Sequence, residues 1–200
     1  MPKWITGLVA LVLVAIASPA LAGERKVLAI GDGAPAFSGL TGTDGKPHAL
    51  SDYADAKLLV VVFTCNHCPV AQSYEERLLA LAHDYRERGV RFVAVSPSDD
   101  EADSLEAMKA RAKDKAYPFD YLRDPSRQAA QAFGARATPE VFVFDAERKL
   151  AYVGGIDDDW QEAKAMRASW LRDALDALLS GDKPASARTK AVGCPIHYDD

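Results

Sequence analysis

The chain has 200 residues, with 24 basic and 29 acidic side chains and a formal net charge of −5. This acidic balance argues against nucleic acid as a partner, and the length suits one domain with a full hydrophobic core. The three cysteines are an odd number, so intramolecular disulfides cannot account for all of them.

Residues 1–22 have the features of a cleaved export signal. Lys3 supplies the positive charge, residues 5–16 form a short apolar stretch, and residues 20–22 read Ala-Leu-Ala, a small-residue cleavage site. The apolar stretch is shorter than the ~20 residues that a membrane-spanning helix needs. We therefore expect cleavage after Ala22 and a periplasmic or secreted protein without membrane contact. An uncleaved anchor is the alternative.

A C-x-x-C motif stands between a predicted strand and a predicted helix. Residues 58–63 are an unbroken apolar run, which predicts a buried strand, and Cys65-Asn66-His67-Cys68 follows almost at once. Thiol–disulfide exchange needs an accessible, easily ionised first cysteine and a second cysteine close enough to displace it. The start of a helix near Cys68 favours a thiolate electrostatically. We interpret the motif as redox-active, with half of a zinc site as the alternative.

The rest of the chain predicts alternating strands and helices in one domain, residues 23–180. A Thr-Asp-Gly-Lys turn at 43–46 predicts a β-hairpin before the motif. After it, the pattern predicts helices at 70–85, 105–116 and 162–179, a short helix ending at 133, and strands at 90–95, 121–122, 140–145 and 150–153. Met166 and Trp170 are expected on the buried face of the last helix. We interpret the aspartates of the loop 96–103 as helix caps, and residues 181–200 as an irregular tail that docks on the domain.

Four short motifs in order resemble one family. They are Gly31 to Phe37, Gly45 to Asp52, Phe63 to Pro69 and Thr189 to Ile196. Together they resemble the peroxiredoxin-like (redoxin, AhpC/TSA) family of the thioredoxin superfamily, in a form with a C-x-x-C motif. The resemblance implies an α/β thioredoxin-like fold, with a central mixed β-sheet flanked by helices and an N-terminal β-hairpin extension.

The same resemblance implies roles for individual residues. Pro139 matches a cis proline that faces the active cysteines, and Thr138 before it would offer its backbone to a substrate strand. Two departures stand out. A peroxidatic cysteine at position 68 would require threonine at position 65 and proline at position 61, where this chain has Cys65 and Val61. The buried aspartate of thioredoxins is replaced by Leu59, so the proton acceptor for the second cysteine is unidentified; Glu75 or a water could serve.

We expect an exported thiol–disulfide oxidoreductase, with Cys65 as nucleophile and Cys68 as resolving thiol. Asn66 and His67 would modulate the motif, and His67 either makes the disulfide more oxidising or faces solvent with little effect. The direction of electron flow therefore stays open. The expected partners are protein thiols or disulfides and an electron donor or acceptor protein, with no cofactor.

Two alternative functions remain, and one cysteine needs its own account. The first alternative is a peroxiredoxin-like thiol peroxidase. The second is a copper- or zinc-binding protein using Cys65, Cys68 and His67 with Cys194 and His197, although we expect no metal. For Cys194 we expect a buried thiol that anchors the tail. A third redox thiol or a link between two chains is also open.

Overall fold

The computed structural model describes residues 1, 27–162 and 166–198. The predicted signal segment, apart from Met1, lies outside the described residues. Within the described part of the chain, no helix is long and apolar enough to cross a membrane.

A seven-stranded mixed sheet forms the centre of the molecule, with the order β2-β1-β5-β4-β3-β7-β8. The strands are β1 (Leu40–Gly42), β2 (Pro47–His48), β3 (Leu58–Phe63), β4 (Val90–Ser96), β5 (Asp120–Arg123), β7 (Glu140–Phe144) and β8 (Leu150–Gly154). The central strand β3 pairs in parallel with β4 and antiparallel with β7. Every residue of β3 is buried, because helices cover both faces of the sheet. The predicted central mixed sheet is confirmed.

The predicted N-terminal hairpin is also present. Strands β1 and β2 pair antiparallel around the turn at 43–46, where the Asp44 carboxylate accepts a hydrogen bond from the Lys46 backbone N–H. Strand β1 also pairs with β5, which attaches the hairpin to one edge of the sheet. A short 3-10 helix, Leu50–Tyr53, follows and leads into β3.

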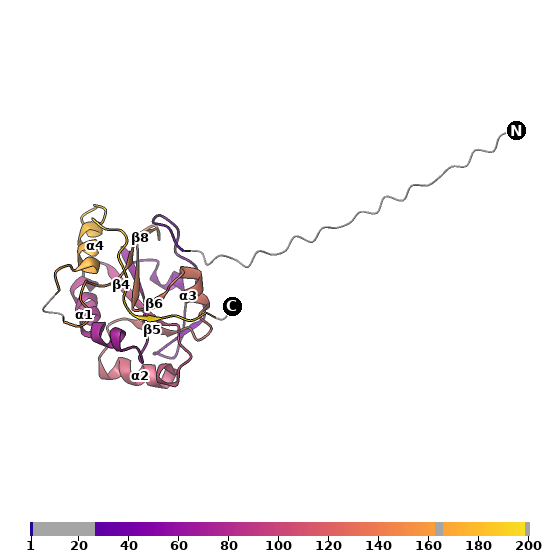
Figure 1. The fold of residues 1–200 in the computed structure, drawn as a ribbon, viewed down its shortest axis with the longest axis horizontal. Helices are drawn as coiled ribbons and strands as arrows, with labels where there is room; N and C mark the ends of the chain where they lie inside the picture. Colours follow the sequence, from indigo (N-terminus) through magenta and orange to yellow (C-terminus); the bar gives the residue numbers. More distant parts are fainter. Residues whose placement is uncertain (2–26, 163–165, 199–200) are drawn as a thin grey trace.

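Helices flank the two faces of the sheet (Figure 1). Helices α1 (Pro69–Arg86) and α4 (Trp170–Leu179) pack on one face, and α3 (Gln128–Phe133) packs on the other. Phe133 of α3 makes edge-to-face contacts with Phe63, Phe142 and Phe144 of the sheet. A second 3-10 helix, Glu101–Asp103, precedes α2 (Leu105–Asp114), which buries Met108 against the β4–β5 side.

The last helix is shorter than the sequence predicts. It begins at Trp170 rather than at residue 162, and Met166 is exposed rather than on a buried face. The Asp158 carboxylate accepts hydrogen bonds from the backbone N–H groups of Arg167 and Ala168. These bonds hold residues 167–169 outside the helix. The helical spacing of apolar residues in the sequence therefore predicts a longer helix than the structure contains.

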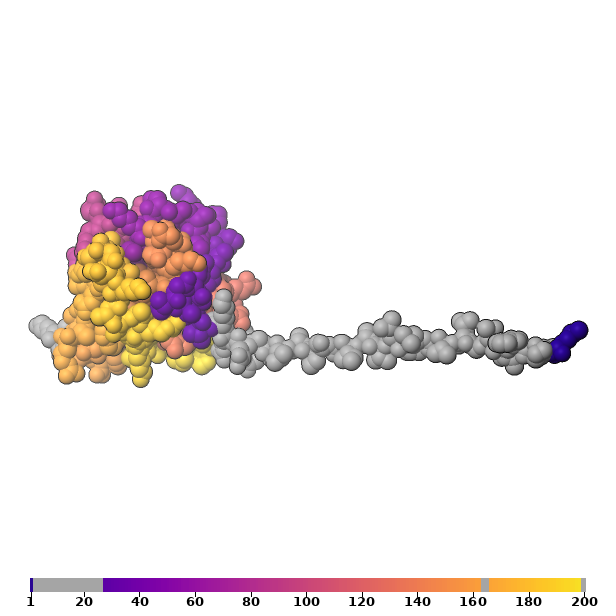
Figure 2. Space-filling model, turned by 90° about the horizontal axis from the view of Figure 1, so that it is seen from above, coloured from indigo at the N-terminus to yellow at the C-terminus, as the bar shows by residue number. Residues whose placement is uncertain are grey.

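The C-terminal segment forms a strand and runs back across the domain. Strand β9 (Cys194–Pro195) pairs antiparallel with β6 (Ala137–Thr138). Before β9, the backbone of the segment bonds with Val153 on the edge strand β8. Figure 2 shows this yellow segment against the body of the molecule, beside the indigo residues that follow the grey trace. The predicted irregular tail therefore contains a short strand.

Candidate active site

The C-x-x-C motif lies at the carboxyl end of β3, as the sequence predicts. Thr64 continues the strand by donating its N–H to the Val95 carbonyl, and Cys65 follows with 5% of its surface exposed. Cys68 is the N-cap of α1 and is fully buried; its sulfur accepts a hydrogen bond from the Ala71 N–H at 3.5 Å. The structure contains both cysteines as free thiols.

Thr138 is the common partner of the two motif cysteines. Its hydroxyl lies 3.2 Å from the Cys65 sulfur, and its carbonyl accepts a hydrogen bond from the Cys68 thiol at 3.1 Å. The bond between Thr138 and Pro139 is cis, as predicted. Strand β6 thus brings the residue before the proline directly against both sulfurs.

Asn66 is buried and holds the motif loop in place. Its backbone N–H donates to the Asp103 carboxylate at 2.5 Å, and its side-chain amide donates to the Ala102 carbonyl at 2.8 Å. The side-chain oxygen accepts from the Tyr121 hydroxyl at 3.1 Å, and the backbone carbonyl accepts from the Gln72 amide at 2.7 Å. With four partners, Asn66 acts on the geometry of the loop and does not face solvent.

His67 connects Cys65 to a buried carboxylate. Its Nε2 atom lies 3.9 Å from the Cys65 sulfur, and its Nδ1 atom contacts the Asp103 carboxylate. The Asp103 side chain is fully buried, whereas the His67 side chain is 42% exposed. The three side chains therefore form a thiol–imidazole–carboxylate series, the geometry in which a carboxylate fixes an imidazole beside a nucleophile.

The interpretation of the acidic loop as helix caps is wrong for Asp103. Asp100 does cap the short 3-10 helix, through a hydrogen bond from the Ala102 N–H, but Asp103 points toward the motif. Strands β3 and β4 are parallel neighbours, so the loops after them meet at the same edge of the sheet. Because the loop of Asp103 directly follows β4, this parallel pairing could have placed Asp103 beside the motif from the sequence alone.

The two thiols of the motif shift each other's pKa in opposite directions. The hydrogen bond with Cys68 and burial raise the pKa of Cys65 well above its usual value. The same bond lowers the pKa of Cys68, and further contacts from Cys194 and the Ala71 N–H act in the same direction. The Cys65 thiol, together with the Ala71 N–H at the start of α1, therefore favours negative charge on Cys68, whereas the C-x-x-C pattern predicted the easily ionised sulfur at Cys65. Transfer of the Cys65 proton to Cys68 moves that charge to Cys65.

Cys194 completes a cluster of three cysteines. It is the register partner of Thr138 in the β6–β9 pair and packs against the core cluster that contains Cys68. Cys194 is half-buried, whereas the sequence predicted a buried thiol. Burial and the contact with Cys68 raise the pKa of Cys194 to about 11. A groove of about 200 Å³ runs past Cys65, His67, Thr138 and Cys194.

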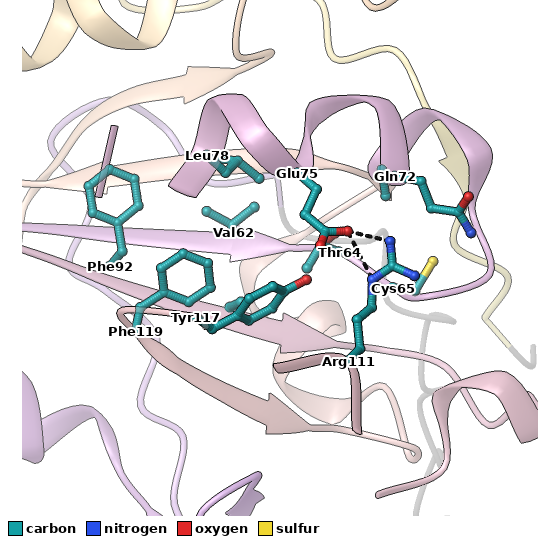
Figure 3. A pocket seen from close by; sticks show the side chains of 12 residues that line it. Val62, Thr64, Cys65, Gln72, Glu75, Leu78, Phe92, Arg111, Tyr117 and Phe119 are labelled. Atoms are coloured by element: carbon teal, nitrogen blue, oxygen red, sulfur yellow. Dashed lines mark hydrogen bonds and ion pairs between the residues drawn. The ribbon is translucent and has the colours of Figure 1, made fainter. Parts of the chain in front are cut away.

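A second, small cavity is also lined by Cys65, together with residues of α1 and α2 (Figure 3). Its volume of about 20 Å³ is enough for one water molecule. Glu75 of α1 and Arg111 of α2 form an ion pair at its wall, with Arg111 Nε 2.9 Å from Glu75 Oε2. The other carboxylate oxygen, Oε1, is buried without a partner among the described residues. Glu75 therefore shares a cavity with Cys65, whereas the sequence suggested Glu75 or a water as the proton acceptor for Cys68.

One set of side chains has the spacing of a metal site. The ligand atoms of Cys65, His67 and Asp103 lie within 4.8 Å of one another. The sequence suggested a larger ligand set, in which Cys194 and His197 join the motif. These residues do not all converge on one metal position: Cys194 lies by Cys68, while His197 lines the groove.

The comparisons with known proteins assign the family. The family model of the AhpC/TSA family matches residues 30–153. The chain belongs to the AhpC/TSA family. This membership confirms the resemblance read from the four short motifs.

Solved structures resemble this protein over most of its length. A hypothetical protein, SMc02350 from Sinorhizobium meliloti 1021, has 32% identity and a TM-score of 0.80, over 87% of this chain and 97% of that one. An uncharacterized conserved protein from Geobacillus kaustophilus has 36% identity and a TM-score of 0.80, over 86% and 93%. A putative thiol:disulfide interchange protein DsbE from Chlorobium tepidum shares the fold, with 23% identity and a TM-score of 0.55 over 63% and 84%. The comparison with curated proteins gave no match. The expected thioredoxin-like fold is confirmed.

Proposed function

We propose that this protein is an exported thiol–disulfide oxidoreductase that exchanges a dithiol for a disulfide with partner proteins through Cys65 and Cys68. The observation that carries the proposal is the convergence of both sulfurs on Thr138, beside an open groove. The family and the fold of the DsbE-like neighbour support the same chemistry.

Cys65 is the nucleophile in this proposal, because it lines the groove and Cys68 is fully buried. Proton transfer from Cys65 to the Cys68 thiolate places the charge on Cys65, which attacks a partner disulfide and releases a partner thiolate. Cys68, which carries the transferred proton after the first step, then attacks the Cys65 sulfur of the mixed disulfide and releases the second partner thiolate. The released thiolate takes up the proton that Cys68 loses.

Trapping of mixed disulfides tests the assignment. Cys68→Ser should accumulate a covalent complex with insulin as model disulfide substrate, because the resolving thiol is missing. Cys65→Ser should accumulate none. Non-reducing gel electrophoresis with mass mapping of the linked peptide measures both. Equal trapping by the two variants would refute the assignment.

The reduction potential decides the direction of electron flow. Equilibration with glutathione, followed by thiol counting, gives the potential. A value near about −120 mV identifies an oxidant and one near about −270 mV a reductant.

A thiol peroxidase is the second candidate, because the chain belongs to the AhpC/TSA family. Peroxide consumption by the reduced protein, compared with consumption by Cys65→Ser and Cys68→Ser, distinguishes the two. Fast consumption that survives loss of Cys68 would favour the peroxidase.

Metal binding is the third candidate, and the spacing of Cys65, His67 and Asp103 is the observation that favours it. Titration of anaerobic reduced protein with Zn²⁺ or Cu⁺ measures it. Stoichiometric binding that is lost in both His67→Ala and Asp103→Asn would support a metal site.

We also propose that residues 1–22 direct export and that residues 23–180 form the catalytic domain, with residues 181–200 docked on it. Mass determination of the protein purified from a bacterial periplasm tests the processing. The expected N-terminus is Gly23.

A further inference from the structure

We propose that Cys194 is a third redox-active thiol, which attacks Cys68 of the Cys65–Cys68 disulfide from a tail strand lying in the position of a substrate. The proposal rests on the proposed function in one respect, that Cys65 and Cys68 form a disulfide.

The first argument is the place of the tail strand. Strand β9 pairs antiparallel with β6, and Cys194 stands directly opposite Thr138. Thr138 also contacts the sulfurs of Cys65 and Cys68, so one residue organises all three cysteines. A protein substrate that added a strand to β6 would meet the same backbone groups. The chain therefore presents its own cysteine where a partner would present one.

The second argument is the closeness of the docking. At Gly193, an added Cβ atom would lie 2.1 Å from the Thr138 carbonyl oxygen. Only glycine permits this approach of the tail backbone to β6. On the other side of the cysteine, the Ile196 N–H donates to the Arg136 carbonyl at 2.9 Å. Cys194 is thus fixed from both sides and is not part of a loosely attached end.

The third argument is access to Cys68. Its sulfur is fully buried, so a thiol of another protein cannot reach it without movement of the surrounding chain. Cys194 packs against the cluster that contains Cys68, and it stands opposite Thr138, whose carbonyl lies 3.1 Å from the Cys68 sulfur. Positioning of this kind converts an encounter between two groups into an intramolecular step.

The exchange balances without an added oxidant or reductant. The Cys194 sulfur attacks Cys68, the Cys65–Cys68 bond breaks, and the Cys68–Cys194 bond forms. Cys65 leaves as a thiolate beside His67 and the Thr138 hydroxyl, and takes up the proton that Cys194 loses. The disulfide moves from Cys65 to Cys194, and Cys65 is again a free thiol.

Oxidation of a variant that lacks Cys65 tests the proposal directly. In full-length Cys65→Ser, diamide should link Cys68 to Cys194 within one chain, with loss of both thiols and no dimer. Cys68→Ser is the matched control, since it keeps Cys65 and Cys194 but lacks the sulfur that Cys194 faces. In Cys68→Ser, an intramolecular disulfide between Cys65 and Cys194 should form at least about tenfold more slowly. Peptide mapping after acid quenching identifies the bond. Retention of both thiols in Cys65→Ser, or an intermolecular link only, would overturn the proposal.

A second variant tests the role of the docked strand without removing a sulfur. Gly193→Ala in the Cys65→Ser background should slow the closure by about tenfold, because the new methyl group displaces β9 from β6. Val192→Ala, at an exposed neighbouring position, should leave it unchanged. Equal rates in these two variants would overturn the proposal. Formation of the Cys65–Cys68 disulfide in Cys194→Ser is a separate measurement, whose failure would count against the proposed function instead.

Discussion

At the scale of single residues, His67 and Asp103 add to the control of Cys65 ionisation. The hydrogen bond with Cys68 and burial raise the pKa of Cys65, the Asp103 charge raises it further, and His67 lies between Asp103 and Cys65. A protonated His67 offsets that charge and places an N–H beside the Cys65 sulfur. The carboxylate therefore assists the thiol only through the imidazole, and it opposes ionisation when the imidazole is absent.

This arrangement predicts an unusual pair of variants. His67→Ala should slow alkylation of Cys65 at pH 7 by about tenfold, which corresponds to about one unit of pKa, because a buried negative charge is left uncompensated. Asp103→Asn added to His67→Ala should restore part of the rate. Iodoacetamide labelling across pH, with peptide-level mass spectrometry, measures both.

The control for this pair is His83→Ala, which removes an exposed histidine of α1 and should change nothing. A double variant that reacts as slowly as His67→Ala would show that Asp103 acts only on the shape of the loop.

At the scale of elements, the strands and helices with strong local patterns could be predicted from the sequence. The fully apolar β3 and the Asp44 turn lie where expected, since each depends on neighbours in sequence. The failures depend on distant contacts. The start of α4 is set by Asp158, and β9 has only two residues, too few to produce a pattern. Asp103 was missed for the same reason, because its partners belong to a different loop.

The contact between α1 and α2 depends on an ion pair of unequal burial. The Glu75 side chain is 7% exposed and that of Arg111 is 26% exposed. Removal of the arginine therefore leaves a buried carboxylate without compensation, whereas removal of the glutamate charge leaves an arginine that can reach water.

We expect Arg111→Met to lower the free energy of unfolding by about 3 kcal/mol and Glu75→Gln by about 1 kcal/mol. The double variant should be more stable than Arg111→Met alone. Urea unfolding followed by circular dichroism gives the three values. An Arg111→Met variant that loses no more than Glu75→Gln would contradict the predicted inequality.

At the scale of the whole molecule, the C-terminal segment joins the sheet edge to the active site. The Thr189 hydroxyl bonds with the Tyr152 hydroxyl at 2.6 Å and with the Gly155 N–H at 3.0 Å. Gly154 has a φ of +151°, and a Cβ atom there would lie 2.2 Å from the Thr189 hydroxyl oxygen. The edge strand β8 therefore has a glycine, Gly154, where the C-terminal segment crosses it. In the same way, the segment has a glycine, Gly193, where it meets β6.

Because these contacts lie at both ends of the segment, its removal should affect stability and access to the thiols together. A chain that ends at Asp182 should melt roughly 5–10 °C lower, as several hydrogen bonds and the β6–β9 pair are lost. Cys68 is fully buried in the full-length chain, and in the truncated chain it should become open to alkylation in the native state. Tyr198→Phe removes only the hydroxyl that donates to the Ala135 carbonyl at 2.6 Å, and it should cost about 1 kcal/mol while Cys68 stays protected. Differential scanning calorimetry and native-state labelling measure the two effects. A truncated chain that melts lower while Cys68 stays unreactive would show that the segment supports the fold without covering the site.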